Sequence, residues 1–154
     1  MIQIKTAHTP HHLTKIQTLF QEYAASLDID LDFQNFGEEL ANLPGRYAPP
    51  RGALSIALWE GQVAGCVGLR DLSQGICEMK RLYTRPPFRG LKIGRAMAES
   101  IIQQARDMGY GRMRLDTLAS MERARALYAS LGFQEIPPYC HNPINDAVFL
   151  ELVL

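Results

Sequence analysis

Residues 78–109 decide the fold of this chain, and they read EMKRLYTRPPFRGLKIGRAMAESIIQQARDMG. A strand-like start is stopped by Pro86 and Pro87, because proline cannot donate to a β-ladder. A loop rich in arginine and glycine follows, and apolar residues then recur every three to four positions, which predicts one buried face of a long helix. Loop N–H groups and the positive end of the helix dipole would meet there. The stretch therefore predicts an anion-binding cradle.

The charges of this loop suit a polyanion. Arg89, Lys92 and Arg95 lie close together, and their side chains match the oxygens of a pyrophosphate group. Gly90 lies where the chain must turn, and Gly94 lets a ligand approach the first helical turn closely. The alternative is an ordinary strand–loop–helix unit with a solvated basic turn.

Two motifs, one in this stretch and one downstream of it, carry a family resemblance. Residues 89–94 (RGLKIG) resemble the acetyl-CoA loop of the GNAT N-acetyltransferases, whose pattern is Arg/Gln-x-x-Gly-x-Gly/Ala. Residues 124–133 (ARALYASLGF) resemble that family's second signature, a helix with A-x-x-L-Y that closes on G-F. There are departures: Lys92 replaces the first glycine of the loop pattern, and Met121 stands where many members carry an asparagine. Two signatures in the family's order are more specific than either alone.

The resemblance implies that acetyl-CoA is the acyl donor and that main-chain groups hold it. In the family, the strand before the loop is bulged and meets the acetyl and pantetheine parts, while the loop N–H groups hold the pyrophosphate. The cofactor-binding residues expected on this basis are Leu82, Tyr83, Thr84, Arg89, Gly90, Leu91, Lys92, Ile93, Gly94 and Arg95.

Acetyl transfer to an amine requires a base for the amine and an acid for the departing thiolate. By resemblance to the histone-acetylating branch of the family, Glu78 is the candidate base. The alternatives are a structural ion pair with Lys80, which shares its strand face, or a water chain as the base. Tyr128 falls at the family position whose hydroxyl protonates the thiolate, whereas the residues alone favour a core tyrosine.

The acceptor site is the least readable part of the sequence. Two loops offer aromatic and polar contacts for a small polar amine: Arg46 and Tyr47 in one, and Tyr139 and Asn142 in the other. Arg46 could also bind a carboxylate. The alternative is that these residues only shape turns, as the neighbouring prolines suggest.

The whole chain predicts one mixed α/β domain over residues 1–154. Strands are expected at 2–7, 53–59, 62–72, 75–85, 112–117, 133–136 and 147–154, with helices from 9, from 31 to 43, from 93 and from 120 to 131. This order matches the GNAT order. It predicts a central, mixed but mostly antiparallel sheet of about seven strands flanked by helices, with the strand at 112–117 parallel to the one before the long helix.

Composition restricts the partners. Of 154 residues, 47% are apolar, and 16 basic side chains balance 16 acidic ones, which gives no sign of a nucleic-acid partner. We expect no membrane span and no signal peptide, and therefore a cytoplasmic protein. The 3 cysteines lack C-x-x-C spacing, and the histidines near the N-terminus lack a fourth ligand, so no metal is expected.

These observations predict an enzyme that moves an acetyl group from acetyl-CoA to the primary amine of a small molecule, by direct attack in a ternary complex. One alternative is a protein N-terminal or lysine acetyltransferase. Another is a non-catalytic CoA-binding sensor, which the unusual Lys92 and Met121 keep open. The apolar final strand could be covered by a partner or by an internal neighbour, so both a monomer and a homodimer are consistent with it.

Overall fold

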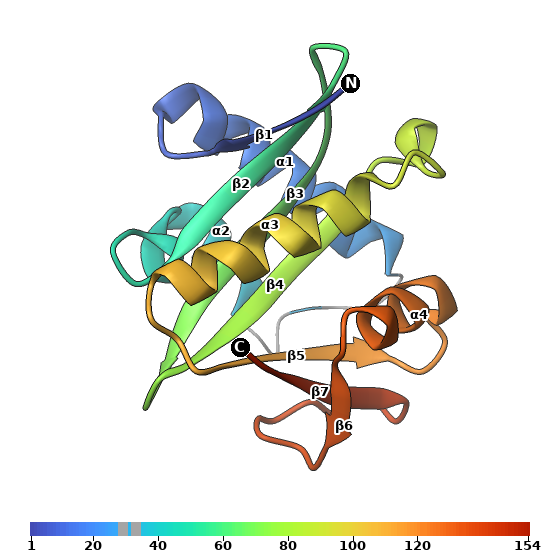
Figure 1. Ribbon diagram of the computed structural model, residues 1–154. Helices are drawn as coiled ribbons and strands as arrows, with labels where there is room; N and C mark the ends of the chain where they lie inside the picture. Colours follow the sequence, from blue (N-terminus) through green and yellow to red (C-terminus); the bar gives the residue numbers. More distant parts are fainter. Residues whose placement is uncertain (28–30, 32–34) are drawn as a thin grey trace.

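The computed structural model describes residues 1–27, 31 and 35–154, and within them seven strands form one twisted sheet (Figure 1). The strands are β1 (Ile2–Thr6), β2 (Ala53–Trp59), β3 (Gln62–Ser73), β4 (Ile76–Thr84), β5 (Arg112–Leu118), β6 (Gln134–Ile136) and β7 (Ala147–Val153). The helices are α1 (Pro10–Ser26), α2 (Phe36–Ala41), α3 (Ile93–Asp107) and α4 (Glu122–Ser130), with 3₁₀ turns at Gly45–Tyr47 and Pro86–Phe88.

The spatial order of the strands is β1-β2-β3-β4-β5-β7-β6. The pairs are antiparallel except β4 and β5, which are parallel because α3 carries the chain back across the sheet between them. The predicted mixed α/β fold, mostly antiparallel and of about seven strands, is confirmed.

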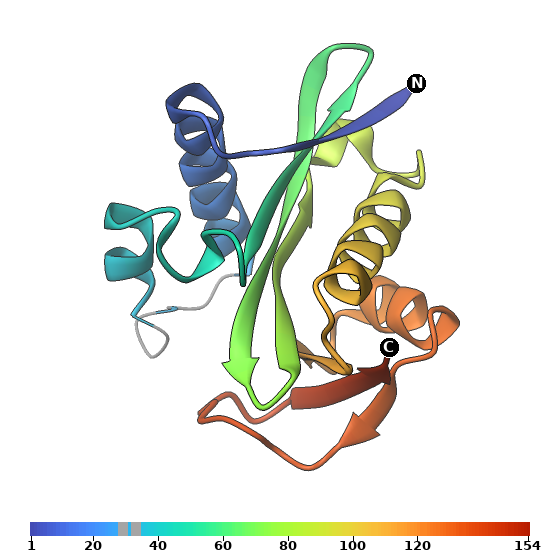
Figure 2. The same cartoon turned by 60° about the vertical axis from the view of Figure 1, so that its left-hand side comes forward.

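Helices cover both faces of the sheet, and each face has its own core. Figure 2 shows α1 and α2 on one side of the strands and α3 and α4 on the other. On the α3 side the core includes Met97 and Ile101, which come from the predicted helical stripe. On the α1 side, Leu19 and Phe20 pack against Tyr47 and the strands. Helices and side chains thus cover the sheet on both sides.

The ends of the elements show where local prediction succeeded. Thr9 caps α1, because its Oγ1 accepts a hydrogen bond from the N–H of His12 at 3.2 Å. The helix expected from residue 120 begins at Glu122: Met121 is the residue that precedes α4, and the N–H of Ser120 donates to Asp146 Oδ2 at 3.3 Å. The helix expected at 31–43 is described only as α2, and its residues 32–34 lie outside the described part of the chain.

The final strand finds its cover inside the fold. β7 lies between β5 and β6, so both of its edges are paired.

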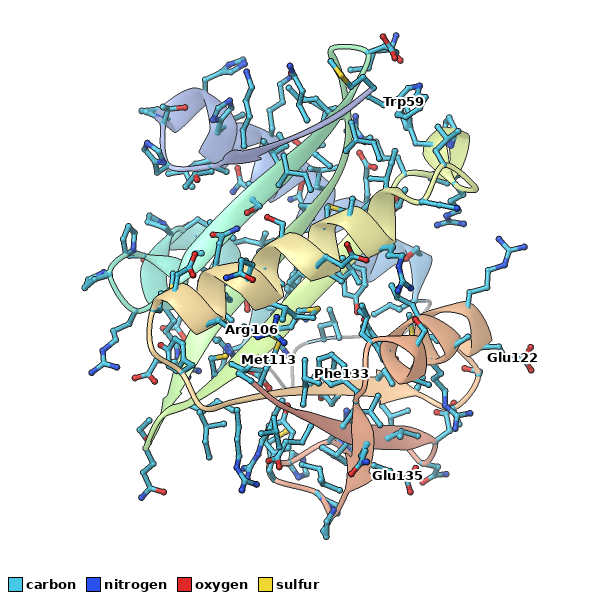
Figure 3. All side chains as sticks on the ribbon, in the orientation of Figure 1. Trp59, Arg106, Met113, Glu122, Phe133 and Glu135 are labelled. Carbon is cyan, nitrogen blue, oxygen red and sulfur yellow. The ribbon has the colours of Figure 1, made fainter. Side chains whose placement is uncertain are left out.

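Figure 3 shows Met113 and Phe133 inside the molecule, whereas Glu122 and Glu135 extend from its surface. No helix in the described ranges is long and apolar enough to cross a membrane.

Candidate active site

The parallel strands β4 and β5 separate partway along their length. In the described structure they pair at three positions, of which the last is Glu78 with Arg114. Beyond this point the two strands border a cavity instead of each other. The gap begins where the sequence passes from Glu78 to Met79 and ends at the Arg/Gly-rich loop.

A bulge interrupts β4 beside this gap. Cys66 pairs with Tyr83 and Gly68 pairs with Lys80, so two β4 residues, Arg81 and Leu82, lie opposite Val67. Arg81 has φ of 60°, in the left-handed region that residues other than glycine seldom adopt. A bulge releases main-chain groups from the ladder. The bulge implied by the family resemblance is therefore present.

The bulged residue is anchored by its side chain. Arg81 donates from Nε and Nη2 to the two carboxylate oxygens of Glu39, both at 3.1 Å, and its guanidinium lies 5.1 Å from the ring centre of Phe36. The Arg81 and Glu39 side chains are only 3% and 10% exposed. A buried bidentate pair of this kind is strongly directional, so it ties the bulge to α2.

A cavity of about 790 Å³ occupies the gap and reaches both faces of the sheet. Such a volume is typical of small-molecule and cofactor sites. On the α3 side it is bordered by the loop before α3 and by one face of α4, including Leu127 and Tyr128. On the α1 side it is bordered by Tyr23, Asp116 and Asn142. The cavity thus passes through the sheet.

The loop before α3 has the main-chain geometry expected of the predicted cradle. Lys92 precedes the helix with φ of 62°, and the first intrahelical bond runs from the N–H of Ala96 to the carbonyl of Lys92 at 3.1 Å. The N–H groups of Ile93, Gly94 and Arg95 therefore have no partner within the helix. A Cβ placed on Gly94 would meet Thr84 Oγ1 at 3.6 Å, so this turn is close to β4 without crowding it.

These features fit a pyrophosphate-bearing cofactor such as acetyl-CoA. Free N–H groups at a helix N-terminus bind phosphate, and an apolar slot between separated strands suits a pantetheine arm. Leu82, Tyr83, Thr84, Arg89, Gly90, Lys92, Ile93 and Gly94 all border the cavity. Leu91 and Arg95 do not, because Leu91 is exposed and Arg95 turns toward α4, where it donates to Ser130 Oγ at 2.8 Å.

Tyr128 borders the same cavity from α4. Its ring packs edge-on against Phe133 with 5.7 Å between ring centres, and the residue is 7% exposed. Within the described chain its hydroxyl makes no hydrogen bond. Burial, with smaller contributions from Tyr23 and Asp116, raises the pKa of Tyr128 well above its usual value. The hydroxyl is therefore protonated at neutral pH, and it has no acceptor among the residues that the structure describes.

Glu78 does not border the cavity. It is 1% exposed, and both of its oxygens accept short hydrogen bonds: Oε1 from Arg70 Nε at 2.6 Å and Oε2 from the Tyr139 hydroxyl at 2.6 Å. Lys80, the alternative partner, forms an ion pair with Asp116, and its charge also interacts with that of Glu78. Glu78 is therefore held in a buried polar cluster at the point where β4 and β5 part.

Asp116 and Lys80 face each other across the gap. Lys80 Nζ lies 3.6 Å from Asp116 Oδ1, and the side chains are 5% and 8% exposed. Asn142 donates from Nδ2 to Asp116 Oδ2 at 3.1 Å. Burial lowers the pKa of Lys80. All three residues border the cavity on its α1 side.

Strand alternation explains why these polar groups gather on one face. Met79 and Leu115 belong to the core beneath α3, so their chain neighbours Glu78, Lys80 and Asp116 point to the opposite face. The cradle and Tyr128 are thus on one side of the gap and the polar cluster is on the other.

The four residues expected to bind the acceptor are scattered. Of these, Asn142 borders the cavity. Tyr139 donates its hydroxyl hydrogen to Glu78, as described above. Tyr47 is buried and donates to Glu39 Oε2 at 3.1 Å, and Arg46 donates from Nη2 to the carbonyl of Asp71 at 2.9 Å. The structure therefore places Arg46 and Tyr47 in structural contacts outside the cavity lining.

Sequence reasoning missed Asp116 and Tyr23. The signal for Asp116 was available, since a carboxylate inside the alternating strand RMRLDTL is unusual for a half-buried segment. Tyr23 gave no such signal, because it follows the apolar stripe of α1. In the described chain no cluster of three or more histidine, cysteine or acidic residues could hold a metal ion.

Comparison with known proteins extends this picture to other chains. A family model described as the acetyltransferase (GNAT) family matches residues 13–133. An uncharacterized N-acetyltransferase of Schizosaccharomyces pombe is 43% identical over 98% of this chain and 94% of its own length. Another, of Dictyostelium discoideum, is 33% identical over 98% of this chain and 99% of its own.

The fold has solved counterparts. The crystal structure of an acetyltransferase from Streptococcus agalactiae matches with a TM-score of 0.80 and 26% identity, covering 99% of this chain and 98% of that one. The likeness extends well beyond the cradle and includes both termini.

Proposed function

This chain belongs to the GNAT family of acetyltransferases, and we propose that it moves an acetyl group from acetyl-CoA to the primary amine of a small molecule by direct attack in a ternary complex. The observation that carries the proposal is the cavity that passes through the sheet between β4 and β5. The groups expected to bind the acyl donor border the cavity on the α3 side, and the carboxylate of Asp116 borders it on the α1 side. Two substrates could therefore meet inside the gap without an acetylated enzyme intermediate.

The donor side is assigned to main-chain groups. The N–H groups from Gly90 to Arg95 would hold the pyrophosphate, and the bulged segment Leu82–Thr84 would lie along the pantetheine arm and the acetyl carbonyl. When bound, acetyl-CoA supplies the acetyl group as a thioester. Main-chain N–H groups near the bulge would stabilise the negative charge that develops on the carbonyl oxygen.

For the base we propose Asp116 instead of Glu78. An amine with a pKa of about 10 is mostly protonated at neutral pH, so a proton must leave before the nitrogen can attack. Asp116 borders the cavity, whereas Glu78 does not. Asp116 would attract the ammonium form of the acceptor and take its proton, directly or through a water molecule.

Tyr128 is proposed as the acid. It approaches the gap from α4, on the opposite side from Asp116, and its hydroxyl is protonated and without a protein partner in the described chain. It would donate its proton to the sulfur as the carbon–sulfur bond breaks. Starting from the ammonium, the nitrogen loses two protons: one passes to Asp116 before attack, and the second leaves the nitrogen as the amide forms and restores, through solvent, the proton that Tyr128 gives to sulfur, so that one proton is released to solvent overall.

A small acceptor is favoured over a protein substrate. The α1 side of the cavity is bordered by both apolar and polar groups, including Tyr23, Leu27 and Ile144, as is common for small-molecule sites. The equal numbers of acidic and basic residues do not favour a basic tail as the substrate.

The test begins with calorimetric titration of the protein with acetyl-CoA, with desulfo-CoA and ADP as comparison ligands. Binding with a Kd on the order of micromolar is expected. A panel of small amines is then assayed for free thiol release beside a panel of peptides with free N-termini or lysines. Turnover restricted to peptides would overturn the choice of acceptor, and tight binding without any turnover would favour a CoA sensor.

A further inference from the structure

The segment that connects β6 to β7, residues 137–146, is held to the sheet by side chains. Tyr139 donates its hydroxyl hydrogen to Glu78 on β4, and Asn142 donates to Asp116 on β5. Asp146 accepts a hydrogen bond from the N–H of Ser120 through Oδ2 and another from the N–H of Ala119 through its carbonyl, the latter at 2.7 Å. The position of this segment therefore depends on three separate attachments.

The Tyr139 attachment is the most strongly built. Its ring lies edge-on to Phe149 with 5.5 Å between ring centres, and the guanidinium of Arg114 lies 5.4 Å from its centre. These contacts fix the ring, and the hydroxyl meets Glu78 at 2.6 Å. A hydrogen bond to a buried carboxylate is stronger than a neutral one, because the acceptor carries a full charge in a poorly hydrated place.

The carboxylate of Glu78 is itself prevented from turning. Arg70 donates to its other oxygen at 2.6 Å from the neighbouring strand β3, where Arg70 and Glu78 are paired residues. Glu78 is therefore fixed relative to the sheet, and it fixes the position of the Tyr139 hydroxyl in turn. A carboxylate held by donors on both oxygens is well suited to holding a loop.

Asn142 carries the connection to the cavity. Its Oδ1 accepts a hydrogen bond from the N–H of Ile144 at 3.1 Å, which orients the amide so that Nδ2 points to Asp116 Oδ2. One Asp116 oxygen is thus occupied by Asn142, and the other faces Lys80. A shift at Tyr139 would reach Asp116 through a single intervening side chain.

We propose that Glu78 and Tyr139 form a positioning pair that sets the acceptor side of the site by holding residues 137–146, and with them Asn142, against Asp116. This inference rests on the proposed function, in which Asp116 receives the acceptor amine. Glu78 then acts on the reaction through Tyr139 and Asn142 and does not touch the substrate.

Tyr139→Phe is the decisive variant, because it removes the hydroxyl and keeps the ring contacts and the Arg70–Glu78 pair. The expected result is a KM for the amine raised about tenfold, with kcat within about threefold and the KM for acetyl-CoA unchanged. Tyr110→Phe is the matched control. The Tyr110 hydroxyl donates to the carbonyl of Arg51 at 2.6 Å outside the cavity lining, so its loss should leave both KM values unchanged.

Glu78→Gln separates a positioning role from a base. A positioning role predicts a raised KM and an acidic limb of the pH–rate profile that stays at its wild-type pH. Loss of a general base predicts a kcat lower by about 10²-fold or more and the disappearance of that limb, and this result would overturn the proposal. Thermal unfolding of both variants shows whether they are folded under the assay conditions.

Amide hydrogen exchange tests the loop without any turnover. Residues 137–146 should exchange about tenfold faster in Tyr139→Phe than in the wild type, and at the wild-type rate in Tyr110→Phe. Unchanged exchange in Tyr139→Phe would overturn the proposal even if no amine is ever acetylated. Failure of the proposed function would be recognised separately, as acetyl-CoA binding by the wild type without turnover.

Discussion

The two faces of the gap between β4 and β5 are built in different ways. On the α3 side, the cradle uses main-chain groups of one continuous stretch, from the bulge at Arg81 to the first turn of α3. On the α1 side, side chains from segments far apart in the chain meet, among them Glu78, Asp116, Tyr139 and Asn142. The cradle is therefore a local property of the sequence, whereas the side-chain cluster exists only when the whole sheet has formed.

This difference teaches where chemistry and binding reside in such a fold. Main-chain groups offer the same N–H donors whatever the side chains, so a cradle tolerates substitution. A cluster of paired charges depends on each member, since removing one leaves another buried without a partner. Substitutions of the side chains assigned to proton transfer should therefore have the larger effects on turnover, and substitutions in the main-chain cradle should be mild.

Asp116→Asn should give the largest effect. We expect kcat to fall by about 10³-fold, because the proton acceptor is lost, while the Kd for acetyl-CoA stays within about twofold, because the cradle is unchanged. Initial rates with a saturating amine, beside calorimetry with acetyl-CoA, provide the measurement. Full activity in Asp116→Asn together with a lost acidic limb in Glu78→Gln would reverse the assignment of the base.

Tyr128→Phe should rank second, with kcat lower by about 10²-fold and acetyl-CoA affinity unchanged. Burial raises the pKa of this hydroxyl, so the group stays protonated as the pH rises through the usual value of about 10. Wild-type kcat should therefore show no loss up to about pH 10 that could be assigned to Tyr128. A variant that binds acetyl-CoA and retains the wild-type rate would remove Tyr128 from the reaction.

Lys92→Gly probes the cradle and should be mild for binding. Lys92 has φ of 62°, which costs a residue with a Cβ about 1 kcal/mol, so glycine should stabilise the fold by that amount. Chemical denaturation measures the gain, and Lys92→Ala is the control because it loses the charge but keeps the Cβ. If main-chain N–H groups carry the binding, both variants should bind acetyl-CoA within about threefold of the wild type.

Glu151→Gln should have the smallest effect. Hydrogen bonds from Arg114 and then Arg112 lower the pKa of Glu151, so its contribution to stability is present above its unfolded pKa of about 4.3 and is lost as the pH falls through the folded value. The expected loss at pH 7 is below about 1 kcal/mol, and it should vanish at low pH. Urea unfolding at several pH values measures this loss of stability. A change in kcat would show that the side-chain cluster on the α1 side includes Glu151 of β7.

Much of the fold could be predicted because its signals are local. The apolar stripe of α3, the proline at the start of α1 and the short turns between β2, β3 and β4 each specify one element or one antiparallel pair. The parallel pairing of β4 with β5 followed from the length of the intervening helix.

The cradle was predictable for the same reason, and the acceptor side was not. Glu78 was expected to act as a base, with an ion pair to Lys80 as one alternative, but the structure pairs it with Arg70 on β3 and Tyr139 in the β6–β7 connection. Nothing in the sequence around Tyr139 or Asn142 indicates which strand each will meet. Tyr47 is both aromatic and polar, as binding residues often are, yet its ring packs in the core beside Phe20.

The passage of the cavity through the sheet has a consequence for inhibition. A bisubstrate compound, in which an amine is joined to CoA through the acetyl position, would occupy both faces at once. Because the second half would bind at a high effective concentration, the affinity of such a compound could exceed that of either half by orders of magnitude. It would also link β4 to β5 where they share no ladder, so it should raise the melting temperature more than either half does alone.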